Sequence, residues 1–242
     1  MKLVFGPMAT LSHQGMRQTI GEFGGCDEYY TEMIQASSYV GRGPYESYYV
    51  LNGPNPNAIV WQLTGNSKEP IVKAAPLIME HGGIGIDLNM GCSAPEIVRQ
   101  GAGIAWMSKP LQETRELVSS VRRELDVTGY TQARLSVKMR LGEENWTLEG
   151  FHQFIDMLIG EGVTQLVLHP RTRKEKYGRP AHWEQVENLA QYVHEKYGNK
   201  ILVIGNGDIK DVESFIKNTT KATSSDGVMI ARYGVQKPWL FS

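Results

Sequence analysis

Short runs of β-branched and aliphatic residues alternate with longer amphipathic stretches along most of the chain. This alternation is typical of βα units that build a parallel sheet. The apolar runs predict eight strands, at Leu3–Gly6, Glu28–Met33, Ala58–Leu63, Ile84–Asn89, Arg134–Arg140, Gln165–His169, Ile201–Gly205 and Gly227–Ala231. The longer stretches predict helices at Ser67–His81, Leu111–Glu124, Thr147–Glu161 and His182–Lys196. Eight strands with crossover helices favour a closed (β/α)8 TIM barrel, and a doubly wound open sheet is the alternative.

Several predicted strands are aliphatic on one face and polar on the other, because successive residues of a strand point to opposite faces of the sheet. If the aliphatic faces pack against the helices, the polar faces point into the barrel. The last polar residues of the strands then lie at the C-terminal mouth, where barrel active sites are built. Six side chains are expected to converge there: Gln62, Asn89, Lys138, His169, Asn206 and Arg232.

The composition fits one soluble globular domain over residues 1–242. Hydrophobic residues make up 41% of the chain and charged residues 21%, which excludes the low hydrophobicity of disordered proteins. No apolar run approaches the roughly 18 residues of a membrane span, and the N-terminus lacks the apolar segment of a signal peptide. We therefore expect a cytoplasmic protein without a membrane segment, and a monomer.

Charge and cysteine content limit the possible partners. The formal net charge is −1, from 25 basic and 26 acidic residues, so the chain as a whole carries no electrostatic signature of nucleic-acid binding. Any RNA binding must come from local patches. The only two cysteines, Cys26 and Cys92, cannot form a disulfide framework or a metal site by themselves. We expect free thiols and no metal ion.

Two other segments stand out between and after the predicted strands. Gly41–Asn57 is rich in glycine, proline, asparagine and tyrosine, which predicts an active-site loop with at most a short helix. Pro238–Ser242 resembles the beginning of a closing helix, so we expect the last helix to be cut short.

The turns after the last two strands predict an anion site. Gly205–Ile209 follows an apolar strand and precedes a helix, and Ala231-Arg232 ends the next strand. Glycine lets the backbone approach an anion, free N–H groups bind it, and an arginine adds charge. Barrels often hold a phosphate between the seventh and eighth strands. An ordinary tight turn beside a surface arginine is an equally good interpretation of this segment alone.

Lys138 and Arg140 share the inward face of one strand, so they enter the mouth together. Buried cations need anionic partners, which are either Asp87 or a ligand. A structural ion pair is the alternative interpretation. Gln62 can hydrogen-bond a ligand in the same place, although alone it is better explained as a polar residue that closes a strand.

The segment His169–Arg179 holds five basic side chains and one acidic one directly after a strand. Such a loop can grip a polyanion, with Tyr177 available to stack on a base. A solvated charged loop is the more usual outcome of such a run. His169 alone is more often a strand-end histidine than a catalytic group.

Cys92 follows the fourth predicted strand in a glycine-containing turn at the C-terminal mouth. A free cysteine is mainly a thiol at neutral pH, so it can donate a proton or, when activated, act as a nucleophile. A small buried turn residue is an equally good interpretation from spacing alone. Cys26 precedes the second strand, at the opposite end of the barrel, and is expected to be structural.

Together these segments resemble the tRNA-dihydrouridine synthase family over nearly the whole chain. Any one segment is a weak signal, but eight in order form a specific one. They are Gly6–Ala9, Thr31–Met33, Gln62–Gly65, Ile86–Cys92, Val137–Gly142, His169–Arg173, Gly205–Ile209, and Met229–Arg232 with Pro238–Phe241.

The resemblance implies an FMN-dependent oxidoreductase in which NADPH reduces the flavin and a uracil of tRNA is then reduced across C5=C6. Cys92 is the implied proton donor, and hydride comes from the flavin. The base must leave its stack to reach them. The implied FMN-binding residues are Pro7, Met8, Gln62, Lys138, His169, Asn206, Gly207, Asp208, Ala231 and Arg232. The expected substrate-binding residues are Asn89, Arg140, Arg171, Arg173 and Tyr177.

The chain departs from the family pattern beside two of these residues. Ser93 stands where proline usually follows the cysteine, and Pro170 stands where glycine usually follows the histidine. Family members also carry a C-terminal helical domain that binds tRNA, which we expect to be absent here, so tRNA binding by the barrel alone should be weak. Two other functions stay open: FMN-dependent reduction of a small pyrimidine or enone, and a non-catalytic barrel that binds FMN or RNA.

Overall fold

A computed structural model, which describes residues 1–53, 55–175 and 177–242, confirms the closed barrel. Pro54 and Lys176, in two of the predicted loops, lie outside the described residues. All strand pairings are parallel, and the pairing of β2 with β4 closes the sheet into an eight-stranded ring. The strands are β1 (Lys2–Phe5), β2 (Glu28–Tyr30), β3 (Ile34–Gln35), β4 (Ile59–Thr64), β5 (Gly85–Met90), β6 (Arg134–Arg140), β7 (Gln165–His169), β8 (Leu202–Asn206) and β9 (Gly227–Ile230).

The second predicted strand, Glu28–Met33, is broken in the structure. It ends at Tyr30, and a two-residue strand, β3, resumes the pairing with β4 at Ile34. At the break the Thr31 hydroxyl, in place of a backbone carbonyl, accepts the N–H of Gln62 at 3.0 Å. The interruption frees Met33 from the sheet, and its side chain lines the central cavity.

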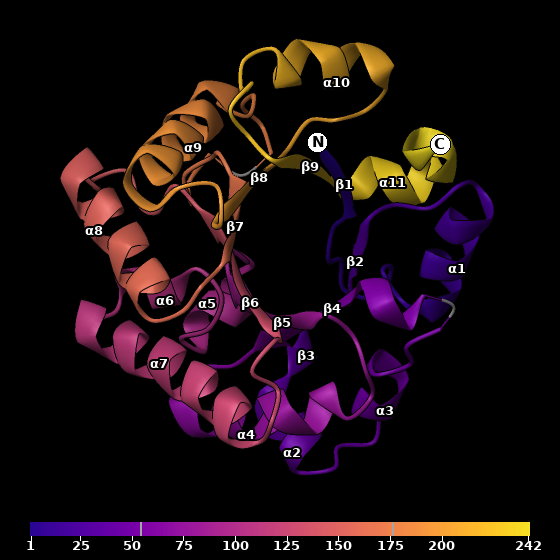
Figure 1. Ribbon diagram of the computed structural model, residues 1–242, viewed down its shortest axis with the longest axis vertical. Coiled ribbons are helices and arrows are strands. Elements are labelled where there is room, and N and C mark those ends of the chain that lie inside the picture. Colours follow the sequence, from indigo (N-terminus) through magenta and orange to yellow (C-terminus); the bar gives the residue numbers. More distant parts are fainter. Residues whose placement is uncertain (54, 176) are drawn as a thin grey trace.

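Helices surround the barrel as an outer ring (Figure 1). The four predicted helices are confirmed to within a few residues at each end, while shorter ones were not predicted. The helices are α1 (Gln14–Glu22), α2 (Ala36–Val40), α3 (Glu46–Tyr49), α4 (Lys68–Met79), α5 (Pro95–Arg99), α6 (Ala105–Ser108), α7 (Leu111–Val127), α8 (Leu148–Gly160), α9 (Trp183–Tyr197), α10 (Val212–Thr219) and α11 (Arg232–Gln236), with 3-10 turns η1 (Pro56–Ala58) and η2 (Pro238–Phe241).

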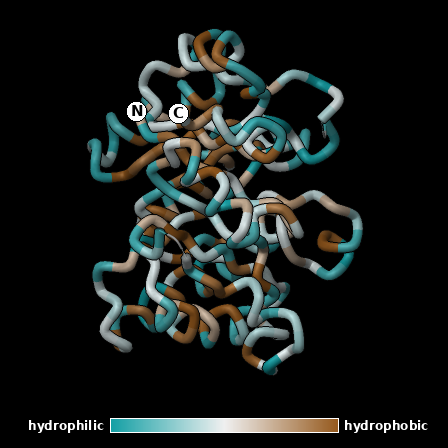
Figure 2. The backbone as a smooth tube through the Cα atoms, turned by 90° about the vertical axis from the view of Figure 1, so that its right-hand side faces the viewer, coloured by the Kyte–Doolittle hydropathy of each residue, from teal (hydrophilic) through white to brown (hydrophobic). Residues whose placement is uncertain are grey.

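The predicted alternation of strand faces is confirmed by two separate hydrophobic clusters. The larger lies between the sheet and the helices and contains the outward residues of β4, β5, β6 and β7. The smaller lies inside the barrel and consists of Val4, Tyr30, Val60, Val167, Ile204 and Met229. In Figure 2 the hydrophobic stretches run mainly through the interior and hydrophilic ones occur on the outer loops.

The N-terminal end of the barrel is closed by a buried charged cluster around Glu28, which is 1% exposed. Lys2 and Arg134 each form an ion pair with Glu28 Oε1, at 2.6 and 2.8 Å. Gln165 donates to Glu28 Oε2 at 3.1 Å and to the Tyr30 hydroxyl at 2.8 Å. These contacts satisfy the carboxylate inside the fold, so this end is a plug, and the open site lies at the other end.

The segment Gly41–Asn57 does contain a short helix, α3, as expected. None of its described residues lines the central cavity, so its predicted place at the active site is not supported. Among the described residues, no helix is both long and apolar enough to cross a membrane.

Gly205 gives a direct test of the packing between β8 and α9. A Cβ added there would lie 2.4 Å from the ring of Trp183, which is fully buried. Gly205→Ala should therefore lower the free energy of unfolding by about 1–3 kcal/mol, as overpacked cores do. Gly160→Ala is the matched control, because a Cβ at that helical position meets nothing within 4 Å. Urea denaturation of both variants should show a loss only for Gly205→Ala; equal stabilities would contradict this packing.

Candidate active site

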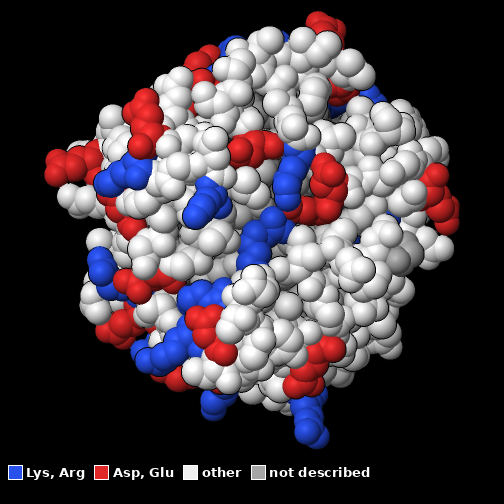
Figure 3. Space-filling model, in the orientation of Figure 1, with Lys and Arg blue, Asp and Glu red and all other residues white. Residues whose placement is uncertain are grey.

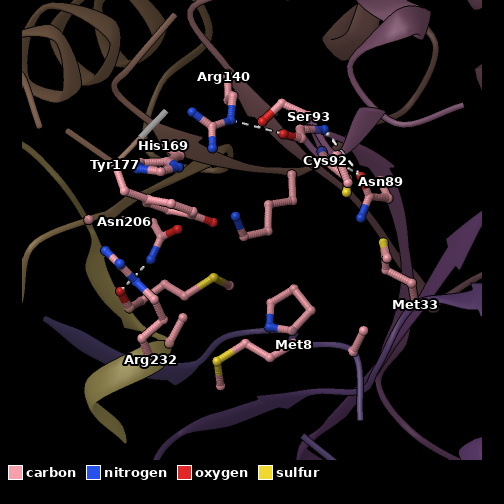
Figure 4. Close-up of a pocket in the computed structure, with 18 of the residues that line it drawn as sticks. Met8, Met33, Asn89, Cys92, Ser93, Arg140, His169, Tyr177, Asn206 and Arg232 are labelled. Carbon is pink, nitrogen blue, oxygen red and sulfur yellow. Dashed lines mark hydrogen bonds between the residues drawn. The ribbon is translucent and has the colours of Figure 1, made fainter. Parts of the chain in front are cut away.

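A cavity of about 690 Å³ opens at the C-terminal ends of the strands. It is lined by Cys92, by all ten residues expected to bind the cofactor, and by three of the five residues expected to bind substrate, Asn89, Arg140 and Tyr177. Figure 4 shows Cys92 and Asn89 on one side of this cavity and Asn206 and Arg232 on the opposite side. The two sides therefore carry different chemistry.

The Cys92 side is built on a continuous chain of hydrogen bonds from the barrel interior. Asp87, fully buried, accepts Gln62 Nε2 at 2.7 Å and the Ser136 hydroxyl at 2.7 Å. The side-chain oxygen of Gln62, Oε1, in turn accepts a hydrogen bond from Asn89 Nδ2 at 2.8 Å. These bonds fix which atom of each amide faces which neighbour, and each Nε2 and Nδ2 group keeps one further N–H.

The turn that carries Cys92 is held at several points. Asn89 Oδ1 accepts the backbone N–H groups of Gly91 at 3.3 Å and Cys92 at 3.0 Å. Arg140 Nε donates to the carbonyl of Gly91 at 3.0 Å, and the Cys92 carbonyl accepts the N–H of Ile104 at 3.0 Å. These contacts hold the turn although serine follows the cysteine.

Two cations from β6 enter the same cavity. Burial and the neighbouring Arg140 guanidinium lower the pKa of Lys138 to about 8, although Asp87 and Cys92 act in the opposite direction. Burial also lowers the pKa of Arg140. Burial raises the pKa of Asp87 to about 6. Asp87 is one carboxyl group beside two cationic side chains, Lys138 and Arg140. The local charge is therefore positive, and this part of the cavity favours an anionic ligand.

The opposite side of the cavity has the features of an anion cradle. Gly207 has a φ of +133°, and an added Cβ would lie 3.0 Å from Ala181 and 3.1 Å from the ring of His169. The N–H groups of Gly207 and Asp208 have no acceptor within the described chain. The Arg232 guanidinium, which lines the same cavity, lies 4.1 Å from the centre of the Tyr177 ring.

The two remaining predicted substrate residues, Arg171 and Arg173, do not line the cavity. Arg173 is on the surface, where it forms an ion pair with Glu143 at 2.8 Å. The Arg171 side chain is only 1% exposed and lies 2.7 Å from a carboxylate oxygen of Asp208. An RNA phosphate cannot reach this guanidinium without displacing the chain around it, so the structure does not support direct RNA binding by Arg171.

Several cavity residues had no predicted role. Met33, Glu96 and Tyr233 are among them. Met33 lies in one of the motif segments, which was the only signal for it. The other two follow strand ends, at positions where no periodic pattern sets the direction of a side chain.

Comparison with known proteins shows the family to which this chain belongs. A family model described as "Dihydrouridine synthase (Dus)" matches residues 3–242. The chain belongs to the dihydrouridine synthase family. It is 29% identical to a probable tRNA-dihydrouridine synthase of Aquifex aeolicus, over 99% of this chain and 71% of that protein. It is also 29% identical to the tRNA-dihydrouridine(16) synthase of Pseudomonas syringae, over 98% of this chain and 73% of the relative.

Other relatives in the family are considerably longer than this chain. It covers 61% of a probable tRNA-dihydrouridine synthase of Mycobacterium tuberculosis at 28% identity. Among solved structures, KGPDC from Streptococcus mutans matches with a TM-score of 0.57 and 12% identity, over 98% of this chain and 92% of that one. A likeness at this identity supports the barrel fold alone.

The residues of this family member fit a flavin nucleotide. A phosphate suits the free N–H groups at Gly207 and Asp208 with Arg232 beside them. Amide groups that hydrogen-bond a heterocycle are present at Gln62 and Asn89, and the cavity volume is within the usual range for cofactor sites. No group of three or more side chains that could hold a metal ion occurs in the part of the chain that the structure describes.

Lys138 should reduce the stability of the ligand-free protein. Its pKa of about 8 lies below the ordinary 10.5, so the unfolded state binds the proton more tightly. The resulting destabilisation is complete below pH 8 and disappears as the pH rises from about 8 to 10.5. Lys138→Met should therefore raise the free energy of unfolding by roughly 1–2 kcal/mol at pH 7, with allowance for solvent screening.

Urea denaturation of the ligand-free protein at several pH values measures this difference. The advantage of Lys138→Met should shrink towards pH 10, whereas Lys73→Met, at an exposed position on α4, should show no such trend. If the difference in stability between Lys138→Met and the wild type stayed constant across this pH range, the fold would not disfavour the charged form of Lys138.

Proposed function

We propose that this barrel binds FMN, is reduced by NADPH, and reduces uridine in tRNA to 5,6-dihydrouridine. The observation that carries the proposal is the shared cavity, in which Cys92, whose backbone is held by Asn89, lies opposite the anion cradle that contains Arg232. Membership of the dihydrouridine synthase family supports the same chemistry. The name of the rat relative, tRNA-dihydrouridine(47) synthase [NAD(P)(+)]-like, supports a nicotinamide reductant.

The proposed FMN site extends from the cradle to the amide side. Gly207, Asp208, Ala231 and Arg232 are proposed to hold the phosphate, with His169 and Asn206 beside it. Pro7 and Met8, which also line the cavity, are proposed to contact the flavin ring through their backbone. Gln62 and Lys138 are proposed to bind its polar edge, where the ammonium group stabilises negative charge on the reduced ring. When bound and reduced, FMN supplies the hydride for C6 of uracil.

Cys92 is proposed to donate the proton that C5 of uracil receives. A proton and a hydride together saturate C5=C6, so the thiol must stand on the face of the base opposite the flavin. The bonds from Asn89 and Ile104 to the Cys92 backbone keep the thiol at the cavity wall. The thiolate that remains must regain a proton from solvent before the next turnover.

Three further residues are proposed to hold the uracil and its ribose. Asn89 keeps one N–H for a carbonyl oxygen of the base, Arg140 offers a second donor, and Tyr177 presents an aromatic face. A base inside a helical stem cannot reach this cavity, so the uridine must be flipped out. The exposed Arg173 is proposed to contact an RNA phosphate nearby. Both signs of charge are mixed on the face seen in Figure 3, in keeping with local rather than global attraction.

The role of Cys92 is tested by Cys92→Ala. This variant should bind FMN like the wild type, because the Cys92 contacts that hold the turn are made by its backbone. Dihydrouridine formation should fall by about 100-fold or more, the usual contribution of a general acid. The measurement is mass spectrometry of dihydrouridine after incubation with NADPH and an unmodified tRNA transcript.

Cys26→Ala is the matched control. Cys26 lies at the N-terminal end of the barrel, donates to the carbonyl of Glu28 at 3.1 Å, and has a pKa raised to about 12 by burial. Its loss should leave the rate unchanged. Full activity of Cys92→Ala would overturn the proposed role of the thiol. Reduction of free uracil, with no reaction on tRNA, would replace tRNA with a small pyrimidine as the substrate.

A further inference from the structure

Arg171 occupies the centre of a buried network behind the cavity wall. Its Nη1 atom lies 2.8 Å from Nε2 of His169. Its Nη2 atom donates to both carboxylate oxygens of Asp208, at 2.8 and 2.7 Å, and its Nε atom donates to the carbonyl of Arg179 at 2.7 Å. All three kinds of nitrogen are therefore engaged.

The contact with His169 determines where the imidazole carries its proton. Arginine has five N–H donors, no acceptor, and no accessible neutral form in proteins. At 2.8 Å the Nε2 atom must therefore be the acceptor, which requires that it carry no proton. The ring is then neutral, with its single proton on Nδ1.

We infer that Arg171 is a positioning residue that locks His169 in the neutral Nδ1–H tautomer and joins the loops after β7 and β8. The Nδ1–H group has no acceptor within the described chain, and His169 lines the cavity, so the lock leaves one donor free for a ligand. This role replaces the RNA contact that the sequence predicts for Arg171.

The charges around His169 act in the same direction. Lys138 and Arg140 approach from β6 and Arg232 from the start of α11, and Tyr177 stacks on the ring at 6.0 Å between centres. Burial, followed by the positive charges of Lys138 and Arg140, lowers the pKa of His169. A second proton on this ring is therefore opposed by its whole surroundings.

The bond to Asp208 shapes the cradle itself. Asp208 has a φ of 55°, which is unusual for a residue other than glycine. Its carboxylate holds this conformation by accepting from Arg171 and from the N–H of Ala181 at 2.8 Å. The N–H groups of Gly207 and Asp208 are thereby aimed from a fixed backbone. The benefit for FMN rests on the proposed function, whereas the tautomer of His169 does not.

The tautomer can be measured directly on the protein without FMN. Long-range proton–nitrogen correlation spectra of ¹⁵N-histidine-labelled protein at neutral pH separate the two tautomers and the charged ring. His169, assigned by comparison with His169→Gln, should show a protonated Nδ1 and an unprotonated Nε2. A protonated Nε2, or a charged ring, would overturn the inference. This result is independent of whether the protein binds flavin or acts on tRNA.

Arg171→Met removes the lock. The His169 signals should shift towards a mixture that includes the Nε2–H tautomer. FMN affinity, measured by quenching of flavin fluorescence, should fall by about tenfold or more, because the His169 donor and the backbone of Asp208 are no longer held in place. Arg179→Met is the matched control, because it removes an exposed arginine side chain from the same loop and keeps the carbonyl that Arg171 binds.

The control should match the wild type in both measurements. An unchanged His169 tautomer in Arg171→Met would contradict the lock. Arg171→Lys keeps one charge but lacks the fork that serves three acceptors, so it should restore folding more than FMN affinity. If Arg171→Met does not fold, the wild-type tautomer spectrum alone still decides the inference.

Discussion

The barrel depends on the hydrogen bonds that buried polar side chains form with one another inside the closed sheet. From Glu28 at the plugged end, hydrogen bonds pass through Gln165 to the Tyr30 hydroxyl and on to Ser136 at 3.2 Å. Ser136 donates to Asp87, from which the bonds described above continue to the Cys92 turn. Because each buried polar group must find a partner, the interior that stabilises the fold also fixes the side chains of the mouth.

Much of this site could be predicted because strand alternation alone sets the direction of a side chain. Gln62, Lys138 and His169 line the cavity for that reason, whereas Pro7 and Met8, which also line it, were expected only from the family resemblance. Loop residues have no such periodicity. Arg171 looked like an RNA contact within a basic run, and only the fold shows that it turns inward to Asp208. The strand break at Thr31 was equally hidden, because a side-chain hydroxyl replaces a backbone acceptor there.

The cationic side chains that line the cavity are better explained by ligand binding than by the stability of the fold. Lys138, Arg140 and Arg232 line the cavity, whereas Asp87 is fully buried and does not line it, and Asp208 is already engaged by Arg171. A protein selected for stability alone would avoid such uncompensated cations, whereas an anionic ligand would neutralise them. The charge of Arg171, in contrast, is already paired with the carboxylate of Asp208 inside the fold. Arg171 therefore does not need an anionic ligand.

The most direct test is a titration of the purified, flavin-free protein with FMN, followed by flavin fluorescence. One FMN per chain should bind, and the fluorescence should be quenched as the ring enters the cavity beside Gln62 and Lys138. Binding should weaken with added inorganic phosphate, which competes for the cradle at Gly207 and Arg232. Absence of saturable binding, or binding that phosphate does not affect, would contradict a flavin nucleotide site in this cavity.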